Sequence, residues 1–139
     1  FALLAVLMPI VTGMGGNAGT QTLAVVVRAI ATNQLTSSNT VRMILRELRI
    51  AATNGATLGL LIGTGTALLF GNPLLGAVIG AAMVINNLVA GLAGIMVPVT
   101  LDRLKVDPAV SSAVFVTMAT DVMGFFSFLG LAVLSGLAG

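Results

Sequence analysis

One carboxylate in this sequence stands apart from every other charged residue. Asp121 lies in an apolar stretch that begins at Pro108 and contains no Lys or Arg. A charge in the hydrocarbon of a bilayer costs at least a few kcal/mol, so such residues generally face a partner, a pore or a bound ion. Because no basic residue is near in sequence, we expect a cation to be the partner of Asp121. The alternative is a protonated carboxyl group that hydrogen-bonds a neighbouring helix.

A second group of polar residues lies in residues 13–22, where four glycines alternate with side chains that can hydrogen-bond. At membrane depth this composition predicts a weak helix with freed carbonyls, which is tolerated only where the backbone lines a cavity or is buried in protein. Gly13, Gly16, Asn17 and Thr20 fall at spacings that share one helix face. We therefore expect a polar path to which Asn17 contributes its amide; close packing of helices through small residues is the alternative.

The stretch that carries Asp121 has a matching stripe of small and polar residues. With a rise of ~1.5 Å per residue, Asp121 lies ~20 Å along a helix from Pro108, well inside a hydrocarbon core ~30 Å thick. We expect the stripe to face an ion pathway. Its members are Ala113, Thr117, Thr120, Asp121 and Gly124.

Composition identifies the surroundings of these residues. Of the 139 residues, 58% are hydrophobic and 7% are charged, which is too little charge for a water-soluble surface. We predict an integral membrane protein. The six Lys and Arg residues are too few to follow a phosphate backbone, so no nucleic-acid partner is expected. The absence of Cys and His leaves oxygen as the only ligand type for a metal ion.

The same absences bear on catalysis and on coupled transport. A hydrolase needs a nucleophile with a base, or a pair of carboxylates, and only Asp121 residues paired across a dimer could supply the latter. We do not expect an enzyme. A secondary transporter of another cation or a small solute, with Asp121 as the site of the coupling ion, stays open as an alternative.

Four apolar runs are long enough to cross a membrane, which takes ~20 helical residues. They predict an all-α polytopic bundle and occupy residues 1–27, 51–70, 74–101 and 108–138. Because Phe1 begins in mid-pattern without a charged signal-peptide region, we expect the chain to be a fragment of a longer protein.

Smaller motifs within these runs have their own expected roles. Rows of glycines at positions 55, 59 and 63 and at positions 76 and 80 predict helix packing surfaces. Asp107 and Pro108 are typical of a helix start. Asn86 and Asn87, in the middle of the third run, are explained equally well as an amide bridge between helices or as ion ligands.

The cations predict orientation. The six Lys and Arg residues are Arg28, at the end of the first run, and those of loops 32–50 and 102–107. These positions share one side of a four-span chain. The positive-inside rule makes that side cytoplasmic, in a multi-pass protein of the plasma membrane. Both ends of the chain then face outward. If the intact protein begins in the cytoplasm, this predicts an odd number of upstream spans, most simply one.

Four segments together resemble the membrane domain of the MgtE magnesium channels: residues 9–22, 46–48, 86–88 and 107–121. The resemblance covers nearly the whole chain. It implies that residues 1–139 are an ion-conduction domain of a homodimeric Mg2+ channel with five spans per subunit. It also implies a pore between subunits, lined by the first and last runs, and an upstream span and cytoplasmic regulatory domains outside this sequence.

The resemblance further implies an ion site. An aspartate matching Asp121 holds the central Mg2+, and backbone carbonyls near positions matching Gly13, Gly16 and Thr117 assist. Ala113 departs from the pattern, because some members carry a polar Asn there. Mg2+ demands octahedral oxygen geometry and loses water reluctantly, so one carboxylate per subunit suits a hydrated ion. The expected partners are a second copy, membrane lipid and divalent cations, with Mn2+ and Co2+ as further candidates.

The predicted topology can be tested by labelling single cysteines. Cysteines at Ser37 and Lys105 should react with an impermeant reagent only from the cytoplasm, and a cysteine at Asn72 only from outside. Labelling of Ser37 and Asn72 from the same face would contradict four spans.

Overall fold

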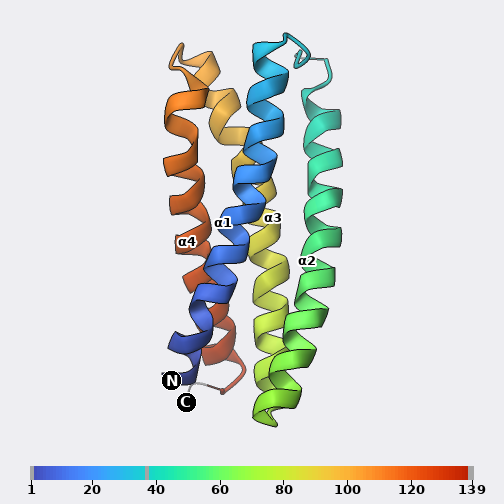
Figure 1. Cartoon of the computed structure of the whole chain (residues 1–139), viewed down its shortest axis with the longest axis vertical. Coiled ribbons are helices and arrows are strands. Elements are labelled where there is room, and N and C mark those ends of the chain that lie inside the picture. The colour runs from blue at the N-terminus through green and yellow to red at the C-terminus, as the bar shows by residue number, and fades with distance from the viewer. Residues whose placement is uncertain (1, 37, 138–139) are drawn as a thin grey trace.

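The computed structural model describes residues 2–36 and 38–137. Phe1, Ser37, Ala138 and Gly139 lie outside the described residues, and with them the outermost ends of the first and last predicted spans and the labelling position at Ser37. The described residues form four helices, α1 (Ala2–Ala31), α2 (Thr40–Phe70), α3 (Pro73–Arg103) and α4 (Pro108–Leu134). They run alternately up and down, so that α1 begins and α4 ends at the same end of the bundle (Figure 1). All four are long and apolar enough to span a membrane, which confirms the predicted class.

The second helix begins earlier than predicted. Helix α2 starts at Thr40 rather than at residue 51, so the charged stretch forms its first turns. Arg42, Arg46 and Arg49 remain exposed there. A helix of 31 residues is ~46 Å long, which exceeds the ~30 Å hydrocarbon core and leaves room for a charged end outside it. The apolar run therefore marks the later part of the helix, not its start.

Short turns and caps set the other boundaries. Gly71 ends α2 in the left-handed region with φ 62°, and the Asn72 side chain accepts a hydrogen bond from the Leu75 N–H at 3.2 Å to start α3. Asp107 accepts from the Ala109 N–H at 3.0 Å ahead of Pro108, which confirms the predicted helix start.

Helix α1 is continuous through the glycine-rich segment, which corrects the prediction of a weakened helix with freed carbonyls. The glycines are contact points rather than breaks. A β-carbon on Gly15 would overlap the Asn86 amide, with Cγ at 2.8 Å, and one on Gly19 would lie 2.6 Å from Val116 Cγ1. Packing of this kind outweighs low helix propensity. Only Pro9, which lacks an N–H, removes a donor from the interior of the helix.

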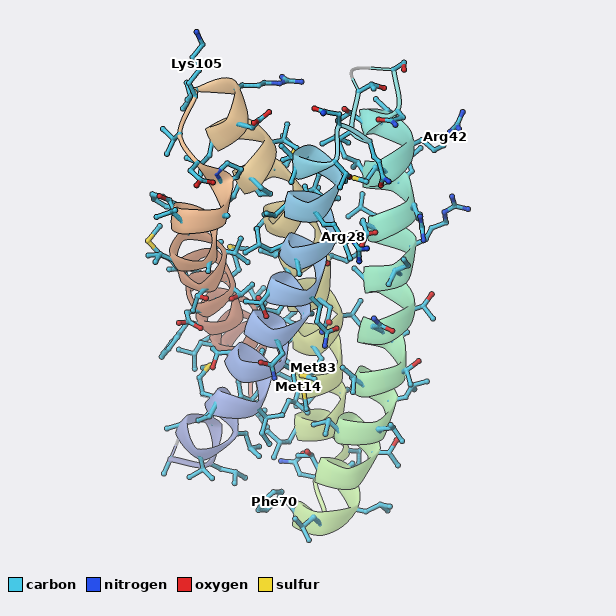
Figure 2. The ribbon with its side chains drawn as sticks, turned by 45° about the horizontal axis from the view of Figure 1, so that its top comes forward. Met14, Arg28, Arg42, Phe70, Met83 and Lys105 are labelled. Atoms are coloured by element: carbon cyan, nitrogen blue, oxygen red, sulfur yellow. The ribbon has the colours of Figure 1, made fainter. Side chains whose placement is uncertain are left out.

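Helix α3 is the centre of the bundle. Within the described residues it contacts all three other helices extensively, whereas α2 has extensive contacts with α3 only. The largest apolar cluster joins α1, α3 and α4 through side chains such as Val11, Ile79, Met83 and Phe128. Met14 packs against this cluster, to which Met83 belongs (Figure 2). Helices α1 and α4 thus both pack against α3.

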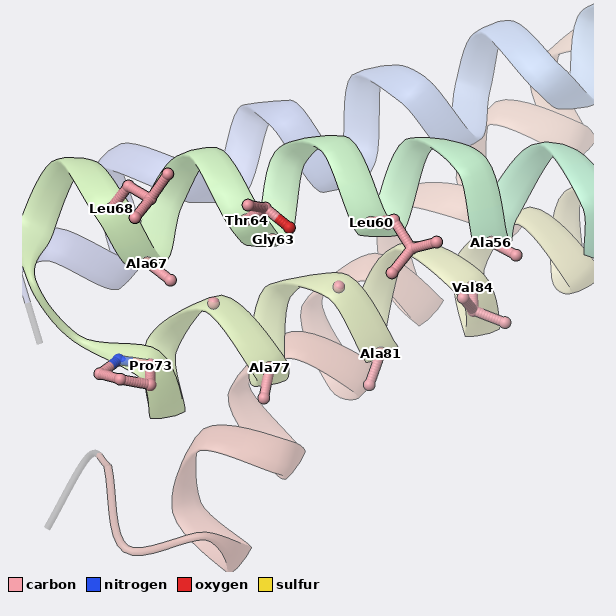
Figure 3. Close-up of a pocket in the computed structure, with 13 residues that line it drawn as sticks. Ala56, Leu60, Gly63, Thr64, Ala67, Leu68, Pro73, Ala77, Ala81 and Val84 are labelled. Atoms are coloured by element: carbon pink, nitrogen blue, oxygen red, sulfur yellow. The ribbon is translucent and has the colours of Figure 1, made fainter.

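The glycine rows join α2 to α3, as predicted. A β-carbon on Gly59 would lie 2.7 Å from the carbonyl oxygen of Gly80, and one on Gly63 would lie 2.7 Å from that of Gly76. Beside this seam runs an open, largely apolar groove of about 610 Å³, lined from both helices by residues such as Leu60, Leu68 and Ala81 (Figure 3). Backbone contact at glycines is therefore what holds α2 in place.

The Lys and Arg residues labelled in Figure 2 lie toward one end of the bundle. Arg42 and Lys105 are at the end opposite Phe70, and Arg28 is in the last turn of α1 on the same side. For these three residues, the folded structure agrees with the one-sided distribution of Lys and Arg from which the topology was predicted.

Replacing Gly63 by Val should weaken the packing of α2 on α3. The added side chain meets the Gly76 carbonyl, and overpacking of this kind costs about 1–3 kcal/mol. Gly65→Val is the matched control, because Gly65 is in the same helix and a β-carbon there meets nothing within 4 Å. Thermal unfolding in detergent should show a lower Tm for Gly63→Val than for Gly65→Val; equal values would contradict the glycine seam.

Candidate ion site

Three close contacts fix how α1 lies against α4. A β-carbon on Gly16 would lie 3.8 Å from Thr120 Oγ1, one on Gly124 would lie 2.8 Å from Thr12 Cγ2, and the Gly19–Val116 contact described above is the third. The numbers rise along α1 as they fall along α4, which is an antiparallel register. Gly16 and Thr120 are therefore at the same depth. The residues that follow them, Asn17 and Asp121, differ in depth by only ~3 Å, because each antiparallel helix rises ~1.5 Å per residue in the opposite direction.

The register also places Asn17 and Asp121 on the same side of the α1–α4 contact. Each follows a contact residue by one position, which is a rotation of ~100° about the helix axis. In antiparallel helices, equal rotations from the contact lead to the same side. Both side chains are exposed on the single subunit. The structure thus brings the predicted carboxylate and the predicted amide to one surface, ~20 Å from either helix end at the charged side.

The other predicted ligands lie on or beside this surface. Gly13 and Thr117 are exposed, and Gly16 is half-buried against Thr120. Ala113 is exposed one turn further toward the charged end of α4. We call this set the α1–α4 face; it comprises Gly13, Gly16, Asn17, Thr117 and Asp121.

The predicted stripe on α4 is wrong at two positions. Thr120 is fully buried and Gly124 is buried, because both face the inside of the bundle rather than the α1–α4 face. The Thr120 hydroxyl donates to the Thr117 carbonyl at 3.0 Å, so its hydrogen is used within its own helix. Likewise, the Thr20 hydroxyl donates to the Asn17 carbonyl at 3.0 Å.

The chemistry of this face suits water as the immediate ligand. Within residues 2–36 and 38–137, no group of three or more acidic side chains could hold a metal ion. Carbonyls in an unbroken helix already accept one hydrogen bond but keep a second lone pair, except where a hydroxyl uses it, as that of Thr120 does at the Thr117 carbonyl. A single carboxylate, an amide and such carbonyls can therefore accept hydrogen bonds from coordinated waters. They are too few to replace the six oxygens that octahedral Mg2+ requires.

The two buried asparagines of α3 have different roles, which the sequence left open. Asn86 Nδ2 donates to the Val11 carbonyl of α1 at 3.0 Å, whereas Asn87 Nδ2 donates to the Met83 carbonyl of its own helix at 2.8 Å. Both side chains are buried, so neither lies on the α1–α4 face. Asn86 is the amide bridge between helices. Sequence reasoning could not choose between the two, because the glycines that make room for Asn86 are on other helices.

Comparison with known proteins bears directly on this arrangement. A family model, MgtE, described as a divalent cation transporter, matches residues 8–131. The chain belongs to the MgtE family. The resemblance drawn from the sequence motifs is thereby confirmed, and the match covers both helices that form the α1–α4 face.

Curated relatives agree with this assignment. The chain is 36% identical over 129 residues to the magnesium transporter MgtE of Bacillus subtilis and 40% identical over 131 residues to that of Enterococcus faecalis. It is 37% identical over 129 residues to the magnesium transporter MgtE of Thermus thermophilus. These matches cover 93%, 94% and 93% of this chain but 29%, 29% and 28% of the respective relatives. The chain therefore spans less than a third of the curated relatives that it matches, all of which are named as transporters.

Proposed function

We propose that this chain is the ion-conducting part of a Mg2+ channel in the plasma membrane, with Asp121 at the central ion site. The observation that carries the proposal is the exposure of Asp121 in the middle of α4, close to the depth of Asn17. A carboxylate at that depth needs a counter-charge or water. A hydrated divalent cation supplies both. The names of the relatives, all magnesium transporters, support Mg2+ as the ion.

The proposed pore lies between two copies of the chain. Closed two-fold symmetry is the commonest form of assembly, and it pairs one surface patch with itself. Placing the α1–α4 faces of two subunits about a two-fold axis along the membrane normal would cover Asp121 from lipid. It would also supply a second carboxylate. The small residues of this face, Gly13, Gly16 and Thr117, leave width for an ion and its waters.

The ion would be held through its hydration shell. Mg2+ dehydrates reluctantly, and the α1–α4 face offers acceptors rather than an octahedral cage. Two carboxylates and the amide of Asn17 would accept hydrogen bonds from the waters, assisted by the carbonyls of Gly13 and Gly16. The Thr117 carbonyl would assist only if the Thr120 hydroxyl, which donates to it, turned away. Such indirect contact also lets the ion leave, which permeation requires. Mn2+ and Co2+, with similar shells, are further candidate ions.

A coupled transporter with Asp121 as the site of the coupling ion is the less favoured alternative. Midplane sites of secondary transporters are commonly built from discontinuous helices. Here both helices of the α1–α4 face, Ala2–Ala31 and Pro108–Leu134, are unbroken. A fixed polar surface on continuous helices fits a pore better than an alternating-access site.

Removing the charge of Asp121 should abolish conduction. Asp121→Asn keeps the size of the side chain, and the full-length protein carrying it should lose Mg2+ flux into proteoliposomes by at least about ten-fold, because the neutral amide no longer offsets the ion's charge. Asp102→Asn is the control, because it removes the same charge at an exposed position near the end of α3, away from the α1–α4 face. An Asp121→Asn protein that transports normally would leave only the structural role for this carboxylate.

An inert mimic of the hydrated ion should block the pore. The ammine ligands of cobalt(III) hexaammine do not exchange, and they can donate hydrogen bonds as coordinated waters do. We expect it to inhibit Mg2+ flux, and to do so less in an Asp121→Ala channel with residual flux, as measured with an indicator dye in proteoliposomes. If hexaammine leaves flux unchanged at concentrations well above those of Mg2+, the ion is dehydrated before selection, contrary to the proposed site.

A further inference from the structure

The amide of Asn86 lies where three helices meet. It comes from the middle of α3, it is fully buried, and its Nδ2 donates to the carbonyl oxygen of Val11 in α1 at 3.0 Å. Val11 is itself fully buried. The bond therefore ties the backbone of α1 to a side chain of the central helix, at a point that water does not reach.

Glycines on both neighbouring helices make the space for this amide. A β-carbon on Gly15 of α1 would overlap Asn86 Nδ2 and lie 2.8 Å from Cγ. A β-carbon on Gly124 of α4 would lie 3.1 Å from the same Nδ2. The amide is thus enclosed by α1 on one side and α4 on the other. Any side chain at either glycine would displace it.

The enclosed amide is next to both halves of the α1–α4 face. Gly15 immediately precedes Gly16 and is two positions before Asn17, and Gly124 is one helical turn after Asp121. Because a helix moves nearly as a rigid body, the position of Val11 relative to α3 sets the rotation and height of Asn17. The contact at Gly124 does the same for Asp121.

The amide is also incompletely paired. Asn86 Oδ1 is buried and has no hydrogen-bond partner among the described residues, and the same holds for Asn87 Oδ1. What distinguishes Asn86 is that its Nδ2 bonds to a different helix, whereas that of Asn87 bonds within its own. A leucine has a similar volume and would leave no orphaned acceptor in this apolar setting. Buried polar groups kept in spite of such a cost are best known for fixing the register of helices.

We propose that Asn86 is a positioning residue for the ion site: it fixes α1 and α4 on α3, so that Asn17 and Asp121 stand at the separation that fits hydrated Mg2+. This inference rests on the proposed function. Ion–oxygen distances differ between Mg2+, at 2.0–2.1 Å, and Ca2+, at 2.3–2.6 Å, so their hydrated sizes differ. A site whose acceptors are held at fixed spacing distinguishes them, and a loosened site does not.

The test replaces each buried asparagine by leucine in the full-length protein. Asn86→Leu should raise the Mg2+ concentration for half-maximal flux by about ten-fold, the scale seen when groups that orient metal ligands are removed. It should also reduce the preference for Mg2+ over Ca2+. Asn87→Leu is the matched control, because Asn87 is equally buried on the same helix but bonds only to Met83. It should change neither quantity, even where both variants lower the Tm.

A second variant keeps the test valid if Asn86→Leu does not fold. In Gly15→Ala the new methyl group occupies the place of the amide, so the same change in ion preference should follow. In the double variant the two changes should not add, because both act on one contact. Additive effects would contradict a shared mechanism.

The position of the helices can be measured without any flux. The chain contains no cysteine. A β-carbon on Gly16 would lie 3.8 Å from Thr120 Oγ1, so Gly16→Cys with Thr120→Cys is a suitable pair for disulfide formation. Adding Asn86→Leu should slow cross-linking of this pair severalfold, and adding Asn87→Leu should not. Equal cross-linking rates in the two backgrounds would contradict the positioning role.

The outcomes separate this inference from the proposed function. If the native protein conducts no Mg2+, or if Asp121→Asn has no effect, the proposed function fails whatever Asn86 does. If Asp121 is essential while Asn86→Leu and Asn87→Leu have the same half-maximal concentration and ion preference, the proposed function stands and the positioning role is wrong.

Discussion

The absence of water in the hydrocarbon core is the constraint on which the rest of this structure depends. Every backbone group there must find a partner within the protein, and continuous helices are the simplest solution. Several side-chain hydroxyls also find partners in this way: those of Thr12, Thr57 and Thr120 donate to carbonyls of their own helices. An exposed carboxylate such as Asp121 is therefore costly at this depth unless it has a polar or charged partner. In the proposed channel it marks the surface that faces the hydrated ion.

Small residues then determine how the helices are arranged. Without a hydrophobic effect to drive them together, helices in a membrane associate where their backbones can approach closely. Gly59 and Gly63 do this for α2 and α3, and Gly16, Gly19 and Gly124 do it for α1 and α4. Of these two seams, the second has the exposed carboxylate and amide of Asp121 and Asn17 beside it, whereas the groove beside the first is largely apolar. Close packing at glycines therefore attaches α2 to α3, and the same kind of packing between α1 and α4 positions the candidate ion site.

Much of this could be predicted from the sequence, because hydropathy and turn residues report directly on membrane depth. The four helices, the turn before Pro73 and the cap at Asp107 all followed from it. The rotation of each helix about its own axis could not be predicted in this way. Thr120 and Asp121 are adjacent in a stripe of small and polar residues, yet one is buried and the other exposed. A repeat of 3.6 residues tells which positions share a face, and only the neighbouring helices decide which way that face points.

The continuity of α1 shows the same limit and explains how the proposed site could be both selective and permeable. Composition alone predicted a weak helix with freed carbonyls at residues 13–22, because the side chains that pack against those glycines lie on α3 and α4 and cannot be read from the segment itself. Freed carbonyls would bind a bare cation tightly and release it slowly. Carbonyls in an intact helix have one lone pair left, enough for a coordinated water but poorly placed for a metal ion. Discrimination must then come from the spacing of the acceptors, which a rigid three-helix junction can hold constant while ions pass.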